Sequence, residues 1–196
     1  HRDIKPANLL LDESGTVKVL DMGLARIEDG GVDAATQAAL TGTGAIMGTV
    51  DYMAPEQAED TKSAGPQADI YSLGASLYYL LTGKSMVTGT AIGKKLKMLM
   101  TGEGLPDSMI GLRSEVSAEL DAVFQKMTAF DMADRYQTMT EVIADLEAIK
   151  AGGVPSSAST PGIQPVGTRS DDSAMQSFLQ KLDDGTVTTG PTVAAS

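Results

Sequence analysis

A chain of 196 residues with 42% hydrophobic and 21% charged residues has a globular composition and is long enough to bury one substantial core. Its net charge of −11 opposes binding to nucleic acid or to an anionic membrane surface, because both need clustered Lys and Arg. The absence of Cys excludes disulfide scaffolds, thiolate metal sites and cysteine nucleophiles, and it suits a cytoplasmic location.

The first predicted element is a β-hairpin. Short apolar runs at residues 9–11 and 17–20 flank the turn-forming sequence DESG, and residues 16–19 alternate between polar and apolar as a strand does. Residues 27–49 are rich in Gly, Ala and Thr without a sustained period, which predicts a long loop of the kind that often carries function.

Two helices are predicted after this loop. The longest apolar run, IYSLGASLYYLL, has 12 residues, whereas a bilayer needs about 20, so we expect a buried helix at residues 68–82 that ends at Gly83. A second helix is predicted at residues 91–100. It contains the one basic cluster, GKKLKM, which is too short to make nucleic-acid or membrane binding an expected function. We expect its Met-rich end, residues 97–100, to be ordinary core or lobe surface rather than a binding groove.

Two further helices complete the predicted domain. The third begins at Ser117, and the fourth begins at a capping box formed by Thr138 and Glu141. The side chains expected to face the core in the last three helices are Leu96, Leu99, Met100, Leu120, Val123, Phe124, Met127, Val142, Ile143, Leu146 and Ile149. A mainly α-helical domain is therefore expected over residues 1–150.

Residues 151–196 are dominated by Gly, Pro, Ser, Thr and Ala, and this composition predicts a flexible tail. Within it, MQSFLQKL at residues 175–182 is compatible with a transient helix or a docking segment, although a solvated linker is the favoured interpretation.

Four short motifs occur in one order along the domain. HRDIKPAN at residues 1–8 matches the pattern HRDxxxxN, and DMG follows at residues 21–23. GTVDYMAPE at residues 48–56 closes the long loop, and DIYSLG at residues 69–74 opens the apolar helix. Four motifs in one order and at compatible spacings are far more specific for a single protein family than any one motif is.

With these motifs the chain resembles the catalytic domain of eukaryotic-like protein kinases, particularly the bacterial Ser/Thr type. The resemblance implies the C-terminal lobe of that fold, a small β-hairpin with a helical bundle, with the catalytic loop at residues 1–8 and the activation segment at residues 21–56. The Gly-rich loop, the β3 Lys and the αC Glu of the N-terminal lobe have no counterpart here. We therefore expect a fragment of a longer kinase that alone binds nucleotide weakly and transfers no phosphate.

The resemblance also implies catalytic roles for five residues, with ATP as phosphate donor and Mg²⁺ as cofactor. Asp3 would orient the substrate hydroxyl and accept its proton, and Lys5 would neutralise charge on the transferring phosphate. Asn8 and Asp21 would hold Mg²⁺ through oxygen ligands, as that ion prefers. Thr49 would contact Asp3 and Lys5. Lys5 and Thr49 both favour Ser/Thr hydroxyls of proteins as substrates.

Other matched residues are implied to be structural: His1, Met22, Gly23, Glu56, Asp69 and Arg135. Glu56 would pair with Arg135, and Asp69 would hydrogen-bond the backbone of the catalytic loop. His1 would pack against Met22, where the family usually has Phe; Met fills irregular gaps, so packing would be preserved.

Arg2 precedes Asp3, an arrangement that in this family accompanies activation by phosphorylation of the loop. A phosphate adds nearly two negative charges that a buried Arg can pair with, and this pairing would order the loop. By their position before GTVDYMAPE, Thr41 and Thr43 are the hypothesised phosphosites.

Two functions of different class remain open from the sequence. The first is a signalling protein Ser/Thr kinase, and the second is a pseudokinase or kinase-like scaffold that binds protein partners. Retention of Asp3, Lys5, Asn8 and Asp21 together favours the kinase. Protein substrates and ATP are the expected partners, nucleic acid is not, and a membrane contact would require an anchor outside this chain.

Overall fold

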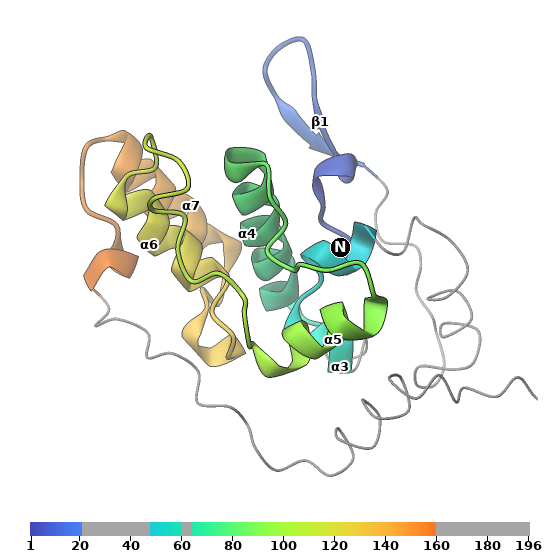
Figure 1. Cartoon of the computed structure of the whole chain (residues 1–196). Helices are drawn as coiled ribbons and strands as arrows, with labels where there is room; N and C mark the ends of the chain where they lie inside the picture. The colour runs from blue at the N-terminus through green and yellow to red at the C-terminus, as the bar shows by residue number, and fades with distance from the viewer. Residues whose placement is uncertain (21–47, 60–63, 160–196) are drawn as a thin grey trace, which may run out of the picture.

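The computed structural model describes residues 1–20, 48–59 and 64–159, and it places a small hairpin beside a group of helices (Figure 1). The strands are β1 (Leu9–Leu11) and β2 (Val17–Val19), and the α-helices are α3 (Pro55–Glu59), α4 (Pro66–Thr82), α5 (Ile92–Thr101), α6 (Ala118–Met127) and α7 (Met139–Lys150). Short 3₁₀ turns are η1 (Pro6–Asn8), η2 (Val50–Tyr52), η4 (Met132–Asp134) and η5 (Ser156–Ser159). The predicted mainly helical fold with one hairpin is confirmed.

The hairpin is antiparallel, with Leu9 opposite Val19. Its turn is organised by Asp12, whose carboxylate accepts hydrogen bonds from the Ser14 hydroxyl at 2.6 Å and from the Thr16 backbone N–H at 3.0 Å. These bonds, the one from Ser14 foremost, lower the pKa of Asp12 to about 2. The local sequence therefore fixes the register that brings the chain back beside Asn8.

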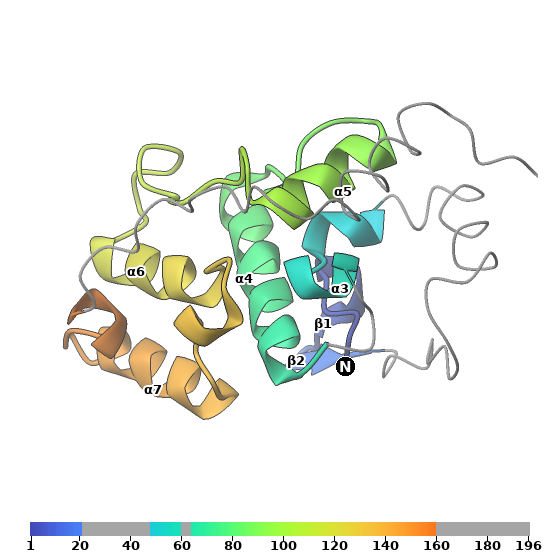
Figure 2. The same cartoon turned by 90° about the horizontal axis from the view of Figure 1, so that it is seen from below.

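Helix α4 runs through the middle of the molecule, with α6 and α7 on one side of it and α3 and α5 on the other (Figure 2). It begins at Pro66, two residues before the predicted start, because Pro is favoured in the first turn. It ends as predicted at Gly83, which has a φ of +70° and caps the helix in the left-handed conformation. The predicted α5 is displaced by one residue.

The core lies along α4. Ile70 packs with Val123 and Met127 of α6, and the ring of Tyr78 stacks on Phe124 with 5.6 Å between ring centroids. Gly74 permits this approach, because a Cβ there would lie 2.6 Å from Thr128 Cγ2 and 3.0 Å from Met127 Cβ. The close contact of α4 with α6 therefore requires glycine at this position.

Helices α6 and α7 both have a side-chain cap at their N-terminus, of which the sequence predicted the one at Thr138. The Ser117 hydroxyl accepts a hydrogen bond from the Leu120 N–H at 3.2 Å, and the Thr138 hydroxyl accepts one from the Glu141 N–H at 3.3 Å. The Glu141 carboxylate returns to the Gln137 N–H at 2.9 Å, one residue before the cap. Helices α6 and α7 therefore start where the sequence predicts.

The predicted buried face of α7 is partly wrong. Val142 is buried, but Ile143 is 50% exposed and Leu146 is 38% exposed. Asp145, which is 5% exposed, occupies the inward position one turn after Val142, whereas Ile143 lies about 100° around the helix from Val142. The apolar periodicity of the sequence did not predict this face, because one of its two buried residues, Asp145, is a carboxylate.

The predicted flexible tail at residues 151–196 begins too early. Asp145 accepts hydrogen bonds from the backbone N–H groups of Ser156 at 2.8 Å and Ser157 at 3.1 Å, and from the Tyr136 hydroxyl at 2.6 Å. The chain after α7 thus folds back onto the helices through η5, because one carboxylate satisfies several donors at once. Residues 160–196 lie outside the described residues.

Burial raises the pKa of Asp145, but the hydrogen bond from Tyr136 and those from Ser156 and Ser157 outweigh burial and bring the pKa down to about 2. Burial and the bond to Asp145 in turn raise the pKa of Tyr136. The ionised carboxylate is therefore the form that the fold requires.

We predict that Asp145→Asn lowers the free energy of unfolding by about 1–3 kcal/mol, the usual cost of losing hydrogen bonds to a charged group. Hydrogen exchange should accelerate at the amides of Ser156 and Ser157. Glu147→Gln, at an exposed position of α7, is the matched control and should change neither quantity. Equal exchange in the two variants would contradict the role of Asp145.

The Asp145 carboxylate also makes the free energy of unfolding depend on pH. Because the pKa of Asp145 falls from 3.8 to about 2 on folding, its contribution is complete above pH 3.8 and is lost as the pH falls toward 2. Urea unfolding at several pH values should therefore show a smaller difference between Asp145→Asn and the unmodified chain at pH 2 than at pH 6. A difference in the free energy of unfolding that is larger at pH 2 than at pH 6 would contradict this prediction.

Candidate active site

The backbone of residues 1–3 is fixed by the start of α4. The carboxylate of Asp69 accepts hydrogen bonds from the backbone nitrogens of His1 at 2.7 Å and Arg2 at 2.8 Å. From α3, the Gln57 side chain donates to the Arg2 carbonyl oxygen at 3.2 Å. Arg2 has a φ of +68°, a left-handed conformation that costs a residue with a Cβ about 1–2 kcal/mol. These contacts hold the strained turn that aims the next residue.

The side chains of the predicted catalytic loop converge. The Lys5 ammonium lies 2.9 Å from Asp3 Oδ2 and also 2.9 Å from the hydroxyl of Thr49, which comes from a segment 44 residues away. The Asn8 amide nitrogen donates to Asp3 Oδ2 at 3.0 Å and to the Asp3 carbonyl oxygen at 2.8 Å. The structure thus brings together four of the five predicted catalytic residues.

His1 links this loop to the end of the hairpin. Its Nδ1 accepts a hydrogen bond from the Asp3 N–H at 3.3 Å, and its Nε2 lies 3.1 Å from the carbonyl oxygen of Leu20. The Leu20 N–H in turn donates to the Asn8 carbonyl oxygen at 2.8 Å. The hairpin therefore delivers the residue before Asp21 to the side of Asn8.

Several predicted residues lie outside the described residues, so their expected contacts remain predictions. These residues are Asp21, Met22, Gly23, Thr41 and Thr43. Arg2, the predicted phosphate partner, is exposed in the described part of the chain and not buried as expected.

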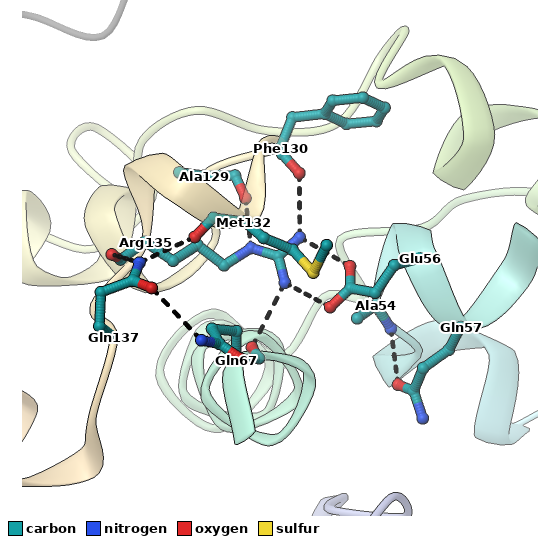
Figure 3. A network of polar contacts seen from close by, with 9 residues as sticks. All are labelled: Ala54, Glu56, Gln57, Gln67, Ala129, Phe130, Met132, Arg135 and Gln137. Atoms are coloured by element: carbon teal, nitrogen blue, oxygen red, sulfur yellow. Dashed lines mark hydrogen bonds and ion pairs between the residues drawn. The ribbon is translucent and has the colours of Figure 1, made fainter. Parts of the chain in front are cut away.

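Arg135 and Glu56 form the expected ion pair (Figure 3). Arg135 Nη1 lies 2.8 Å from Glu56 Oε1, and Nη2 lies 2.9 Å from Oε2, so the contact is bidentate. The guanidinium also donates to the carbonyl oxygens of Ala129, Phe130 and Gln67, and it lies 4.8 Å from the ring centroid of Tyr71. Arg135 is only 2% exposed, so this pair joins α3, α4 and the segment before η4 in the interior.

The donor set of the loop fits a hard divalent cation. Both hydrogen bonds described for the Asn8 side chain use its amide nitrogen, which leaves the amide oxygen available to a ligand of this kind. Asn8 is buried, so that oxygen is held in place. Within the described ranges no group of three His, Cys, Asp or Glu side chains forms a separate metal site.

Two polar contacts near the site have no signal in the sequence. Lys95 of α5 is buried and pairs with Asp51, two residues after Thr49. Gln57 accepts a hydrogen bond from the Ala54 N–H at 3.1 Å besides reaching Arg2. Neither spacing nor composition distinguishes Lys95 from Lys94, which is exposed.

A carboxylate oriented by a Lys and an Asn, beside a Thr hydroxyl from a second segment and anchored to a buried helix through an Asp, is the catalytic-loop arrangement of protein kinases. The chain belongs to the protein kinase family, since a family model described as protein kinase domain matches residues 1–145.

Curated relatives agree with this assignment. The chain is 38% identical over 160 residues to a probable serine/threonine-protein kinase of Corynebacterium efficiens, covering 81% of this chain and 23% of that protein. It is 38% identical over 156 residues to serine/threonine-protein kinase PknB of Mycobacterium tuberculosis (79% of this chain, 24% of that protein), and 40% identical over 147 residues to a probable PknB of Lactococcus lactis (74% and 22%). The chain thus spans about a quarter of the length of these relatives.

Across the described residues no helix is both long and apolar enough to cross a membrane.

We predict that Glu56→Gln lowers the free energy of unfolding by about 3–5 kcal/mol, because it leaves the buried Arg135 charge without its partner. Urea unfolding measures this cost. Glu115→Gln is the control, since it removes an exposed ion pair with Arg113 at 3.6 Å and should cost less than about 1 kcal/mol. Equal costs for the two substitutions would contradict the structural role of the buried pair.

Proposed function

We propose that this chain supplies the catalytic loop and substrate-side lobe of a signalling protein serine/threonine kinase that transfers the γ-phosphate of ATP to protein hydroxyls. The observation that carries the proposal is the position of the Lys5 ammonium, 2.9 Å from both the Asp3 carboxylate and the Thr49 hydroxyl. A base, a cation and the hydroxyl of a substrate-side loop are thereby held in one cluster before substrate arrives, and such preorganisation is the main source of catalysis in phosphoryl transfer.

In the proposed reaction, Asp3 orients the hydroxyl of a substrate Ser or Thr and accepts its proton as the oxygen attacks the γ-phosphorus. The bond from the γ-phosphorus to the bridging oxygen breaks, and ADP leaves. Lys5 balances the negative charge on the transferring group and stays on the Asp3 side through its hydrogen bond to Thr49.

Asn8 and Asp21 are the proposed ligands of Mg²⁺, which when bound would neutralise charge on the nucleotide phosphates. The Asn8 amide nitrogen is used for Asp3, so the geometry of the base and the geometry of the metal ligand are set by one side chain. The Cys-free composition supports a cytoplasmic site of action.

Regulation by phosphorylation of Thr41 or Thr43, read by Arg2, is part of the proposal. Its support is the exposed Arg2 side chain directly beside the catalytic base. Mass spectrometry of the active kinase should find phosphate on Thr41 or Thr43. Phosphate confined to other residues would overturn this assignment.

The alternative of a catalytically silent scaffold has no observation in its favour. A partner-binding lobe has no need of a carboxylate held at hydrogen-bond distance from both Lys5 and Asn8.

Asp3→Asn tests the proposed base. In the chain joined in frame to the N-terminal lobe of a bacterial serine/threonine kinase, the substitution should reduce phosphate transfer to a protein substrate by about 10²–10⁴-fold, the usual contribution of a general base. Asp107→Asn, at an exposed carboxylate outside the loop, is the control and should retain the rate. The 196-residue chain alone should transfer no phosphate, and autophosphorylation by it that Asp3→Asn abolishes would contradict that expectation.

Thr49 offers a second test in the same fusion. Thr49→Val keeps the shape of the side chain but removes the oxygen that accepts from Lys5, so we expect kcat to fall at least about tenfold. Thr49→Ser keeps the hydroxyl and should stay close to the unmodified rate. Equal losses in both variants would show that the methyl group rather than the hydroxyl matters.

A further inference from the structure

A groove lies beside the candidate active site and has no part in the proposed reaction. It is bounded by η2, by the segment that follows α4, and by α5, and it encloses about 540 Å³. Its apolar walls come from Tyr78, Met86, Val87 and Pro106. A cavity of this size accepts one or two large apolar side chains rather than a whole folded element.

The charged residues that line the groove are Lys84, Lys95 and Asp51. The stem of Lys94 lies over the lining residue Gly89, where a Cβ would be 3.5 Å from Lys94 Cδ. The lining charges Lys95 and Asp51 are paired with each other. An occupant with apolar side chains and flanking carboxylates would therefore be complementary to this groove.

One segment of the same chain has this chemistry. In the sequence SDDSAMQSFLQKLDD at residues 170–184, Met175, Phe178, Leu179 and Leu182 recur at the spacing of one helix face. A pair of aspartates precedes this stripe, and a second pair follows it. Amphipathic segments of this kind bind apolar grooves through side chains spaced by three and four residues.

We propose that residues 170–184 dock in this groove within the same molecule, with Phe178 as the apolar anchor and the aspartate pairs facing Lys84 and Lys94. The proposal does not depend on kinase activity, because it concerns only the fit of the segment to the groove. Since η2 lines the groove and begins directly after Thr49, the docked segment covers the side of the lobe next to the catalytic cluster.

The length of the chain permits this contact. The 10 residues at 160–169 span up to about 36 Å when extended, whereas a globular domain of this size has a radius of gyration of about 14 Å. A connection of this length gives an effective concentration of about a millimolar, so that even a weak contact is populated.

A paramagnetic label tests the proposal on the full chain. The chain has no Cys, so Ser173→Cys places a single nitroxide beside the stripe without interrupting it. We expect the label to broaden the backbone NMR signals of residues 84–89 and 104–105 more than those of α7. Dilution should not change this pattern if the contact is made within one molecule.

Two tail variants give the matched comparison. Phe178→Asp, on the apolar stripe, should reduce the relaxation enhancement at residues 84–89 about tenfold or more, because it removes the buried anchor. Gln176→Asp makes the same charge change off the stripe and should retain most of the enhancement. Neither substitution touches the described domain, so its fold is not at risk.

The charge component is tested by Lys84→Glu against Lys150→Glu, which makes the same change at an exposed residue of α7. Only Lys84→Glu should weaken the enhancement. The proposal is overturned if the relaxation enhancement is absent or is centred on other residues. It is also overturned if the enhancement disappears on dilution, as expected for contact between two copies, or if Phe178→Asp and Gln176→Asp change it equally.

Discussion

The buried guanidinium of Arg135 is the interaction on which the arrangement of this lobe depends. A charge removed from water requires compensation, and here the Glu56 carboxylate and three backbone carbonyl oxygens supply it. The donors are planar and fixed, so α3 and α4 are oriented together, with Tyr71 of α4 against the guanidinium face. Helix α4 then presents Asp69 at its start, and Asp69 holds the backbone that carries the catalytic loop.

The loop at residues 1–8 is also held by polar contacts within the lobe. Asp3 follows a residue in a strained conformation, and its carboxylate is oriented by Lys5 and Asn8 from its own loop. Thr49 completes the cluster from a distant segment that ends in Glu56, so the buried ion pair and the catalytic cluster lie at the two ends of one short stretch of chain. The packing of the lobe therefore sets the positions of the proposed catalytic side chains.

Sequence reasoning predicted the elements that depend on local signals. The hairpin, the cap at Thr138 and the end of α4 at Gly83 follow from turn and capping chemistry that acts within a few residues. The sequence did not predict polar groups that are buried because their hydrogen-bond partners come from distant segments. In α7 the residue that faces inward is Asp145 and not Ile143. The groups that donate hydrogen bonds to Asp145 belong to Tyr136 and η5, so the apolar pattern of α7 gives no sign of them. The proposed catalytic residues could be selected from the sequence because the spacing of their motif is specific, whereas the pairing of Lys95 with Asp51 spans 44 residues and carries no motif.

The most direct measurement is a crystal structure of this lobe in a complete kinase domain with Mg²⁺ and a non-hydrolysable ATP analogue. We expect the Asn8 amide oxygen to lie about 2.0–2.1 Å from the metal, with Asp3 still held by Lys5 and Asn8 and facing the end of the nucleotide phosphates. A bound nucleotide whose metal has no contact with Asn8, or an Asp3 carboxylate turned away from the phosphates, would contradict the claim that this loop is the catalytic centre.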